Sequence, residues 1–354
     1  MRDARPSAIY LKDYRPPPFL IQRTRLEFDL HEDHATVSAV LDVVRAEGAG
    51  ADEALVLHGQ ELQLERVELN GNTLDESAYS VGVETLSIGD VPDAFSLRCV
   101  TRIHPQDNTS LEGLYKSRTM FCTQCEAEGF RKITYYLDRP DVMSVFTVTI
   151  TADAARYPVL LSNGNLIETE LLEDGRHRAI WHDPFPKPAY LFALVAGELS
   201  VIEDDFTTSG GRNVNLCIYV EEKDLDKCDH AMDSLKRSMR WDEEVFGREY
   251  DLDVFNIVAV DDFNMGAMEN KSLNIFNTSC VLASPDTTTD AGFQRVESIV
   301  AHEYFHNWSG NRVTCRDWFQ LSLKEGFTVF RDAEFSSDMG SRTVKRVEDV
   351  MVLR

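Results

Sequence analysis

The sequence predicts a chain of more than one domain, with an all-β N-terminal part followed by a mixed α/β part. At 354 residues, two domains are the natural expectation, and a hydrophobic content of 43% is enough to build globular cores. Short segments of alternating apolar residues with frequent turn signals fill the first 200 residues, which is typical of a β sandwich. Beyond that point, apolar residues at helical spacing alternate with strand-like runs.

In the N-terminal part, apolar residues alternate at Leu26, Phe28 and Leu30, and the dipeptide Asn70-Gly71 is a strong hairpin signal. Further half-buried strands are predicted around residues 37–43, 62–69, 95–99 and 146–150. Prolines at positions 184, 186 and 188 punctuate the end of this part. We therefore expect an N-terminal β domain over residues 1–200 and a second domain over residues 201–354.

In the second part, residues 216–220 predict a strand, and apolar residues between 225 and 239 recur at helical spacing. The apolar run 254–260 predicts a buried strand. Two further helices are expected, one leading through residues 294–306 and one over residues 323–334.

The first of these helices carries the pattern His302-Glu303-x-x-His306. Two histidines four residues apart share a helix face and can bind one metal ion. Glu325 follows His306 after eighteen residues, which is enough to turn and bring a third ligand from a second helix. Such a set leaves one tetrahedral position of a zinc ion open, and Glu303 is then the candidate general base.

Two polar residues near this pattern are candidate helpers of the ligands. Asp332 lies seven residues after Glu325 on the same helix face, so it could orient a ligating histidine or be an ordinary solvated carboxylate. Asn307 could also orient the site, and the sequence does not decide between these roles.

A second motif, MGAMEN at residues 265–270, lies upstream of the histidines. Together with HExxH and the later Glu325, it resembles the aminopeptidase N family of zinc aminopeptidases, and bacterial alanyl aminopeptidases in particular. Residues 122–131, 135–141 and 193–197 and the tripeptide 306–308 also match this family. The resemblance extends from about residue 8 to the end of the chain.

The resemblance implies a saddle-like N-terminal β domain and a thermolysin-like catalytic domain that is incomplete at its C-terminal end. It implies one Zn²⁺ per chain, peptide substrates with a free N-terminus, and a preference for Ala and other neutral or basic first residues. Glu269, assisted by Glu126, would bind the substrate amine, which is cationic at pH 7. With zinc and Glu325 at +1 and Glu303, Glu269 and Glu126 at −3, the site would carry a formal charge of −2. The other substrate-binding residues implied are Gln124, Met265, Gly266, Ala267, Met268 and Asn270.

One part of the family pattern is missing. The family stabilises the oxyanion with a tyrosine about 60 residues after the third ligand, whereas this chain stops at Arg354 and has no tyrosine after Tyr304. We therefore expect an N-terminal portion of a longer protein, in which the activity of the 354-residue chain alone is an open question. A folded but inert zinc-binding module is one alternative.

Other zinc hydrolases share part of this pattern. HExxH alone would equally suit an endopeptidase, but a buried carboxylate at Glu269 needs a cationic partner, and this argues for a substrate with a free amine. The epoxide-hydrolysing relatives in the family usually carry Gly where this chain has Ala267. Cys122-x-x-Cys125 has no second pair and no neighbouring histidines, so a structural zinc site there is not expected.

The composition indicates which binding partners and which cellular compartment are to be expected. A net charge of −24 and an isoelectric point near 4.7 argue against nucleic acids and anionic membranes. No stretch approaches the roughly 20 apolar residues of a membrane span, and residues 1–6 lack a signal-like apolar region. Seven irregularly spaced cysteines suggest reduced thiols. We expect a cytoplasmic monomer that takes part in peptide catabolism.

Overall fold

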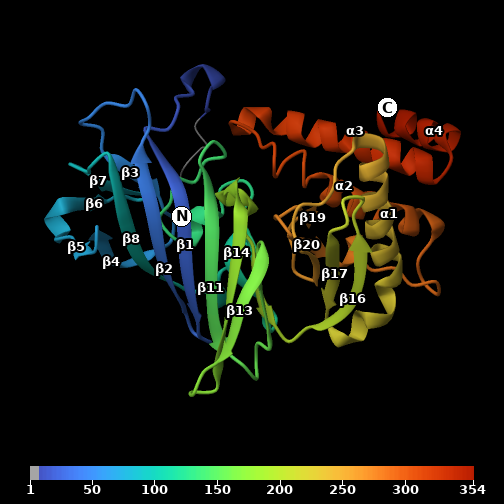
Figure 1. Ribbon diagram of the computed structural model, residues 1–354, viewed down its shortest axis with the longest axis horizontal. Helices are drawn as coiled ribbons and strands as arrows, with labels where there is room; N and C mark the ends of the chain where they lie inside the picture. The colour runs from blue at the N-terminus through green and yellow to red at the C-terminus, as the bar shows by residue number, and fades with distance from the viewer. Residues whose placement is uncertain (1–7) are drawn as a thin grey trace.

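The computed structural model describes residues 8–354, so the N-terminal hexapeptide discussed above lies outside the described residues. The chain forms a β-rich part, blue to green in Figure 1, and a second part of mixed strands and helices, yellow to red. Among the described residues, no helix combines the length and apolarity needed to cross a membrane.

The N-terminal part contains three sheets. Its largest sheet has eight strands in the order β13-β14-β11-β1-β2-β8-β4-β5, and smaller sheets follow the orders β12-β15-β10-β9 and β3-β7-β6. The strands are β1 (Phe19–Leu30), β2 (Ala35–Arg45), β3 (Leu55–His58), β4 (Gln63–Leu69), β5 (Asn72–Thr73), β6 (Tyr79–Val81), β7 (Thr85–Ile88), β8 (Ala94–Ile103), β9 (Gly113–Ser117), β10 (Met120–Gln124), β11 (Met143–Asp153), β12 (Val159–Ser162), β13 (Asn165–Leu171), β14 (Arg176–Pro188) and β15 (Leu194–Gly197).

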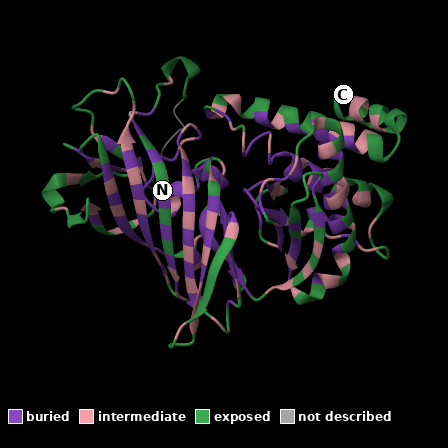
Figure 2. Cartoon of the chain, viewed as in Figure 1, coloured by how far each residue is buried: buried purple, intermediate pink, exposed green. Residues whose placement is uncertain are grey.

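Alternating burial along the long strands places one face of the large sheet on the core. Strand β11 alternates buried and half-buried residues along almost its whole length, which is visible as banding in Figure 2. On the inner face, Phe28 of β1 stacks on Phe192, which precedes β15, with ring centroids 5.7 Å apart. Aromatic packing of this kind joins the large sheet to the four-stranded sheet.

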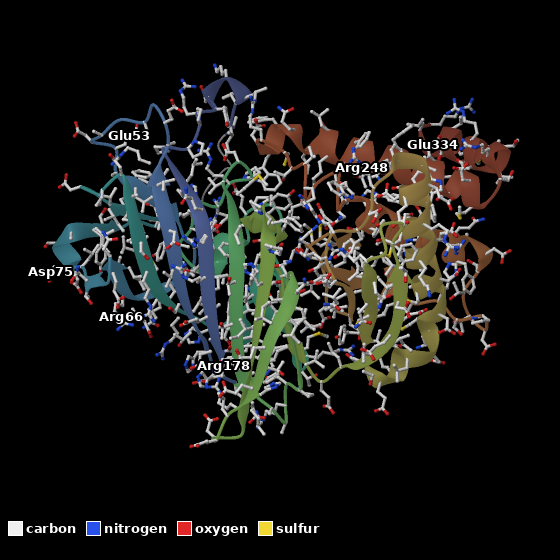
Figure 3. The ribbon with its side chains drawn as sticks, in the orientation of Figure 1. Glu53, Arg66, Asp75, Arg178, Arg248 and Glu334 are labelled. Carbon is white, nitrogen blue, oxygen red and sulfur yellow. The ribbon has the colours of Figure 1, made fainter. Side chains whose placement is uncertain are left out.

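Charged side chains gather on the outside of both parts. Figure 3 labels Glu53, Arg66 and Asp75 at the periphery of the N-terminal part and Glu334 at the periphery of the helices. This distribution is the one expected for a chain with a net charge of −24.

The second part is a five-stranded sheet with helices. Its strand order is β16-β17-β18-β20-β19, and β17, β18 and β20 run parallel to one another. The elements are β16 (Ser200–Thr207), β17 (Asn213–Val220), α1 (Asp229–Phe246), β18 (Val254–Val260), β19 (Ala267–Met268), β20 (Leu273–Asn277), α2 (Asp290–Phe305), α3 (Leu321–Met339) and α4 (Arg342–Val352).

Strand β18 explains how the two parts meet. Ile257 and Ala259 pack into the core shared with α1 and α2, whereas Val258 and Val260 belong to the core of the N-terminal part. A central strand that is covered on both faces needs an almost continuous apolar run, as residues 254–260 provide. One sheet therefore packs against helices on one side and against the β domain on the other.

The predicted fold class is confirmed: a mostly β N-terminal part precedes a partly helical second part. The run 254–260 forms β18 residue for residue, and Asn70 and Gly71 form the β4–β5 hairpin with positive φ angles of 50° and 80°. The helix predicted from Leu225 begins four residues later, because residues 222–227 form a 3₁₀ turn first. The predicted boundary at residue 200 coincides with the first residue of β16, three residues after the end of β15.

Candidate metal centre and the neighbouring carboxylates

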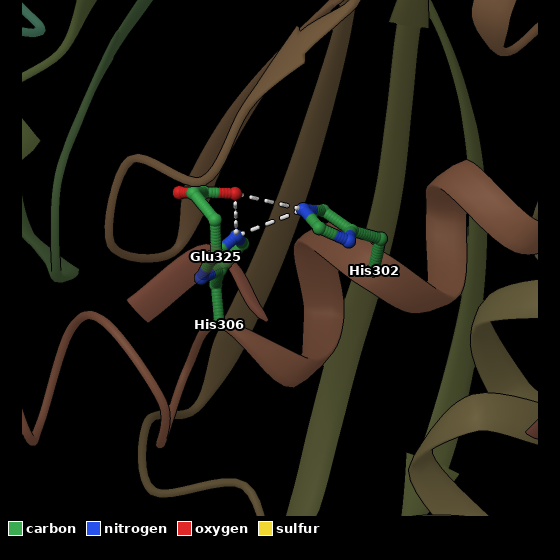
Figure 4. A group of neighbouring side chains, drawn as sticks. All are labelled: His302, His306 and Glu325. Carbon is green, nitrogen blue, oxygen red and sulfur yellow. Dashed lines mark hydrogen bonds and ion pairs between the residues drawn. The ribbon is translucent and has the colours of Figure 1, made fainter. Parts of the chain in front are cut away.

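The two histidines lie where helix α2 ends. His302 is in the last turn of the helix and His306 is its C-terminal cap, so both rings project beside each other with their Nε2 atoms 3.0 Å apart. Glu325, in the second turn of α3, places Oε2 3.4 Å from each of these nitrogens (Figure 4). The three predicted ligands are therefore brought together.

The hydrogen bonds behind the rings indicate what belongs between them. His306 Nδ1 lies 2.8 Å from the carbonyl oxygen of Ser309, and His302 Nδ1 lies 2.7 Å from Asp332 Oδ2. Both partners are acceptors, so each Nδ1 carries the proton, and a neutral ring turns a lone pair on Nε2 toward the other ring. Two lone pairs and a carboxylate converging on one point require a positive charge.

A zinc ion fits this donor set. Tetrahedral bonds of about 2.0–2.2 Å place ligand atoms about 3.3–3.5 Å apart, and the three atoms here are 3.0, 3.4 and 3.4 Å apart. Without a metal, a proton must serve instead: although burial opposes it, the hydrogen bonds that the ring donates to Asp332 and Glu325 raise the pKa of His302 to about 10. Asp332 thus occupies the orienting position considered for it.

Glu303 lies between the two histidines in the helix and is 7% exposed. Its Oε2 atom has no hydrogen-bond partner among residues 8–354. Burial is the main cause that raises its pKa to about 8, with the charges of Glu269 and Glu325 adding to the effect. A buried carboxylate with a free oxygen beside the ligands has the properties of a proton acceptor.

A second cluster adjoins the first. Oxygen atoms of Glu126, Glu269 and Glu325 all lie within 4.8 Å of one another. Glu126 follows β10 in the N-terminal domain, Glu269 follows β19, and Glu325 is on α3. Segments distant in the sequence thus meet as an anionic cradle, which is the name used below for these three carboxylates.

Lys324 lies in the anionic cradle. Its Nζ atom is 2.9 Å from Glu126 Oε1 and 3.0 Å from Glu325 Oε1, and it also pairs with Glu269. Burial alone would lower the pKa of this lysine, but the surrounding carboxylates, Glu269 foremost, raise it well above its usual range. Lys324 also corrects the charge count made from the sequence, because its +1 changes the net charge of the site from −2 to −1.

The carboxylates of the cradle respond differently to their surroundings. Burial, followed by the charge of Glu269, raises the pKa of Glu126 to about 7. Burial also acts to raise the pKa of Glu269, but Lys324 and His306 outweigh it and the pKa is lowered. Glu269 therefore stays ionised more readily than Glu126.

Glu325 belongs to both clusters. Its Oε2 faces the two histidines, whereas its Oε1 faces Lys324 in the cradle. The metal-ligand cluster and the anionic cradle therefore meet at this one carboxylate, so a metal ion in the first would be a close neighbour of an amine bound in the second.

The other predicted substrate-binding residues belong to the two segments that carry Glu126 and Glu269. Gln124 is buried at the end of β10, with Nε2 3.7 Å from Met268 Sδ. Met265 is 45% exposed, and Ala267 begins β19, the edge strand of its sheet. Gly266 uses its carbonyl to accept a hydrogen bond from the backbone of Asn277.

Asn270 is fully buried, and neither atom of its side-chain amide has a hydrogen-bond partner among the described residues. Asn307 also turns away from the ligands: its Oδ1 accepts a hydrogen bond from Lys271 Nζ at 2.6 Å. Tyr304 is buried and packs against Phe255 in the core.

Sequence reasoning missed two lysines. Lys324 directly precedes a predicted ligand, and this adjacency could have indicated its place. Lys271 directly follows the MGAMEN motif and joins Asp251 to Asn307, which ties that motif to the segment after HExxH.

A cavity of about 730 Å³ reaches Lys324, and its lining includes Trp308, Phe327 and the Arg248 labelled in Figure 3.

Both parts of the chain are similar to known proteins. The family model described as the peptidase M1 N-terminal domain matches residues 23–191, and the peptidase family M1 domain matches residues 230–353. The chain is 56% identical to aminopeptidase N of Caulobacter vibrioides over 354 residues, which are 100% of this chain and 41% of that protein. It is also 56% identical to aminopeptidase N of Escherichia coli, covering 99% of this chain and 40% of that protein.

A solved structure is similar over nearly the whole chain. A crystal structure of Legionella pneumophila aminopeptidase A in complex with aspartic acid superposes with a TM-score of 0.92 at 39% identity, over 96% of this chain and 40% of that one. The chain thus spans about 40% of the length of these relatives. Both halves of the chain match one family, and the chain belongs to peptidase family M1.

Proposed function

We propose that this chain carries the metal-holding and amine-binding part of a zinc aminopeptidase, which hydrolyses the first peptide bond of peptides with a free N-terminus. The observation that carries the proposal is the position of Glu325 in both clusters: its Oε2 faces the two histidines, and its Oε1 faces Lys324 inside the anionic cradle. In a peptide, the α-amine is separated from the first carbonyl by a single carbon. Neighbouring metal and ammonium positions therefore select the first bond and exclude internal ones.

The residues have separate tasks in this reaction. His302, His306 and Glu325 would hold one zinc ion, which when bound supplies Lewis-acid chemistry and acidifies water. Glu303 accepts the proton of the attacking water and returns it to the leaving nitrogen. Glu269 and Glu126 bind the α-ammonium group, and the open edge of β19 offers backbone groups for pairing with an extended substrate.

The first residue of the substrate would lie near Gln124, Met265 and Met268. We propose Ala and other neutral or basic residues at this position, as the sequence resemblance implies. The cytoplasm is the proposed compartment, which is supported by seven cysteines that are all free and buried. A role in peptide catabolism and a monomeric state belong to the same proposal, and size-exclusion chromatography with light scattering tests the latter.

The test uses the zinc-loaded chain with an alanine arylamide and its N-acetylated twin. The proposal predicts release of the arylamine from the free-amine compound alone. Glu269→Ala should raise KM strongly, whereas Glu334→Gln, on an exposed face of α3, should change nothing. Cleavage of the acetylated compound would instead indicate an endopeptidase. Binding of zinc without cleavage of either compound would indicate an inert module in this 354-residue form.

A further inference from the structure

Lys324 is the only cation that contacts all three carboxylates of the anionic cradle among the described residues. Its ammonium group has three N–H donors, and each carboxylate offers it one Oε1 atom. One of these carboxylates comes from the N-terminal domain and two come from the second domain. The lysine thus joins groups that nothing in the local sequence would hold together.

The stem of Lys324 occupies a place built for it. The side chain is 2% exposed, and the Nζ atom lies 5.1 Å from the centre of the Tyr190 ring. A Cβ atom at Gly310 would lie 3.3 Å from Cδ of the lysine and 2.8 Å from His306 Nδ1. Because the backbone passes so closely at Gly310, the lysine stem is confined from that side, and the ammonium group is held in place.

The cradle retains acceptors after Lys324 is satisfied. Three carboxylates offer six oxygens, and the lysine contacts the Oε1 atom of each. Glu325 turns its remaining oxygen to the histidines. The second oxygens of Glu126 and Glu269, and free lone pairs on their first oxygens, are left for a further donor.

Without a fixed cation, these carboxylates would repel one another. Glu126 and Glu269 come from different domains, so repulsion would separate them and disorder the acceptors that an incoming amine needs. Preorganised acceptors bind a cation more tightly than acceptors that must first be gathered.

We propose that Lys324 is a positioning residue for amine recognition, which holds Glu126 and Glu269 against Glu325 so that they form one acceptor site. This inference rests on the proposed function and deepens it. The lysine acts through the carboxylates and does not itself touch the substrate amine. Its removal should therefore weaken recognition of a free amine and leave metal binding unchanged.

The experiment compares two ligands on the zinc-loaded 354-residue chain: alanine hydroxamate and its N-acetylated twin. Both offer the same zinc-binding group, so the ratio of their dissociation constants measures recognition of the amine alone. The ratio is measured by calorimetry for the unmodified chain, Lys324→Met, Glu126→Gln and the double variant. Lys345→Met, a lysine on α4 paired with Asp349, is the matched control.

The inference predicts a ratio well above one for the unmodified chain and for K345M. In K324M the ratio should fall at least tenfold, while the affinity for the acetylated twin and the zinc content stay constant. In the E126Q background, K324M should lower the ratio threefold or less, because one of the carboxylates it positions is already neutral. Lys324→Gln provides the same comparison should K324M fail to fold.

Different failures have different meanings. A ratio near one in the unmodified chain would overturn the proposed function and this inference with it. A ratio above one that is unchanged in K324M would overturn the inference alone. A ratio that rises in K324M would show that the lysine competes with the amine, which also contradicts the inference. Equal losses with and without E126Q would contradict action through Glu126.

Discussion

Asp332 shows how a residue that does not hold the metal can set the chemistry of one that does. Its Oδ2 atom lies 2.7 Å from His302 Nδ1 and fixes which ring nitrogen carries the proton. Partners of this kind orient the ring and make the ligating nitrogen more basic. Asp332 is itself largely buried, with an exposed fraction of 9%.

The prediction at this residue is a loss of metal affinity. Asp332→Asn keeps the size of the side chain and an acceptor oxygen but removes the charge, so zinc affinity should fall by about 10–100-fold. Competition with a chromogenic chelator measures it. Glu334→Gln, two positions along the same helix, should leave the affinity as it is. Equal affinities in D332N and the unmodified chain would contradict an orienting role.

His58 carries a prediction about pH. Burial, with the nearby charges of Arg131 and Arg139, lowers the pKa of His58 to about 4, whereas an unfolded histidine titrates near 6.5. Between pH 6.5 and about pH 4, His58 binds a proton in the unfolded chain but stays neutral in the folded chain. The contribution of His58 to the free energy of unfolding is therefore highest above about pH 6.5 and decreases as the pH falls through this range. At pH 5 the loss amounts to about 2 kcal/mol.

Urea unfolding of the unmodified chain and His58→Gln at pH 7.5 and pH 5.0 checks this sign. The unmodified chain should lose about 2 kcal/mol more than H58Q between the two pH values. Parallel changes in the two proteins would show that His58 does not contribute.

At the scale of secondary structure, Arg331 joins three helices. This buried residue of α3 pairs with Asp242 of α1, and its Nη1 donates to the carbonyl oxygen of Phe305 at the end of α2, at 2.9 Å. The end of α2, which carries the metal-binding histidines, is thereby fixed to the other two helices. Removing one partner from a buried pair leaves the other charge without compensation.

Arg331→Met should therefore lower the free energy of unfolding by about 3–5 kcal/mol, measured by urea denaturation. Arg342→Met, at an exposed pair on α4, should cost no more than about 1 kcal/mol. Adding Asp242→Asn to R331M should recover part of the loss, because the uncompensated carboxylate is then gone. Equal costs for R331M and R342M would contradict this account.

How far the sequence predicts these elements depends on whether their cause is local. Strand β18 and the Asn70-Gly71 hairpin follow from burial pattern and turn chemistry, which are local, and both were predicted. Strands β1 and β11 pair in parallel with Arg23 opposite Val145, and no local sequence pattern predicts this long-range pairing. Likewise, the spacing of His302, His306 and Glu325 follows from helix geometry, but the place of Lys324 depends on where Glu126 and Glu269 arrive from elsewhere.

At the scale of the whole molecule, the two domains share a core. Val258 and Val260 of the second domain pack among residues of the β domain. Hydrogen bonds cross the same joint, from Tyr115 Oη to the carbonyl oxygen of Asp262 at 2.9 Å and from Asn163 Nδ2 to that of Lys271 at 2.8 Å. Separating the domains would expose apolar surface on both sides.

Thermal unfolding should therefore show one transition for the whole chain. Differential scanning calorimetry should give a single peak in which the calorimetric and van't Hoff enthalpies agree. Two resolved peaks, or a calorimetric enthalpy well above the van't Hoff value, would show that the domains unfold separately.

The anionic cradle lies across this joint, and the metal ligands do not. His302, His306 and Glu325 all come from the helices of the second domain, whereas Glu126 reaches the cradle from the β domain. A ligand that binds only the metal therefore strengthens one domain. A ligand that also presents an ammonium group contacts both domains. Binding of one positive charge therefore stabilises the association of the two domains.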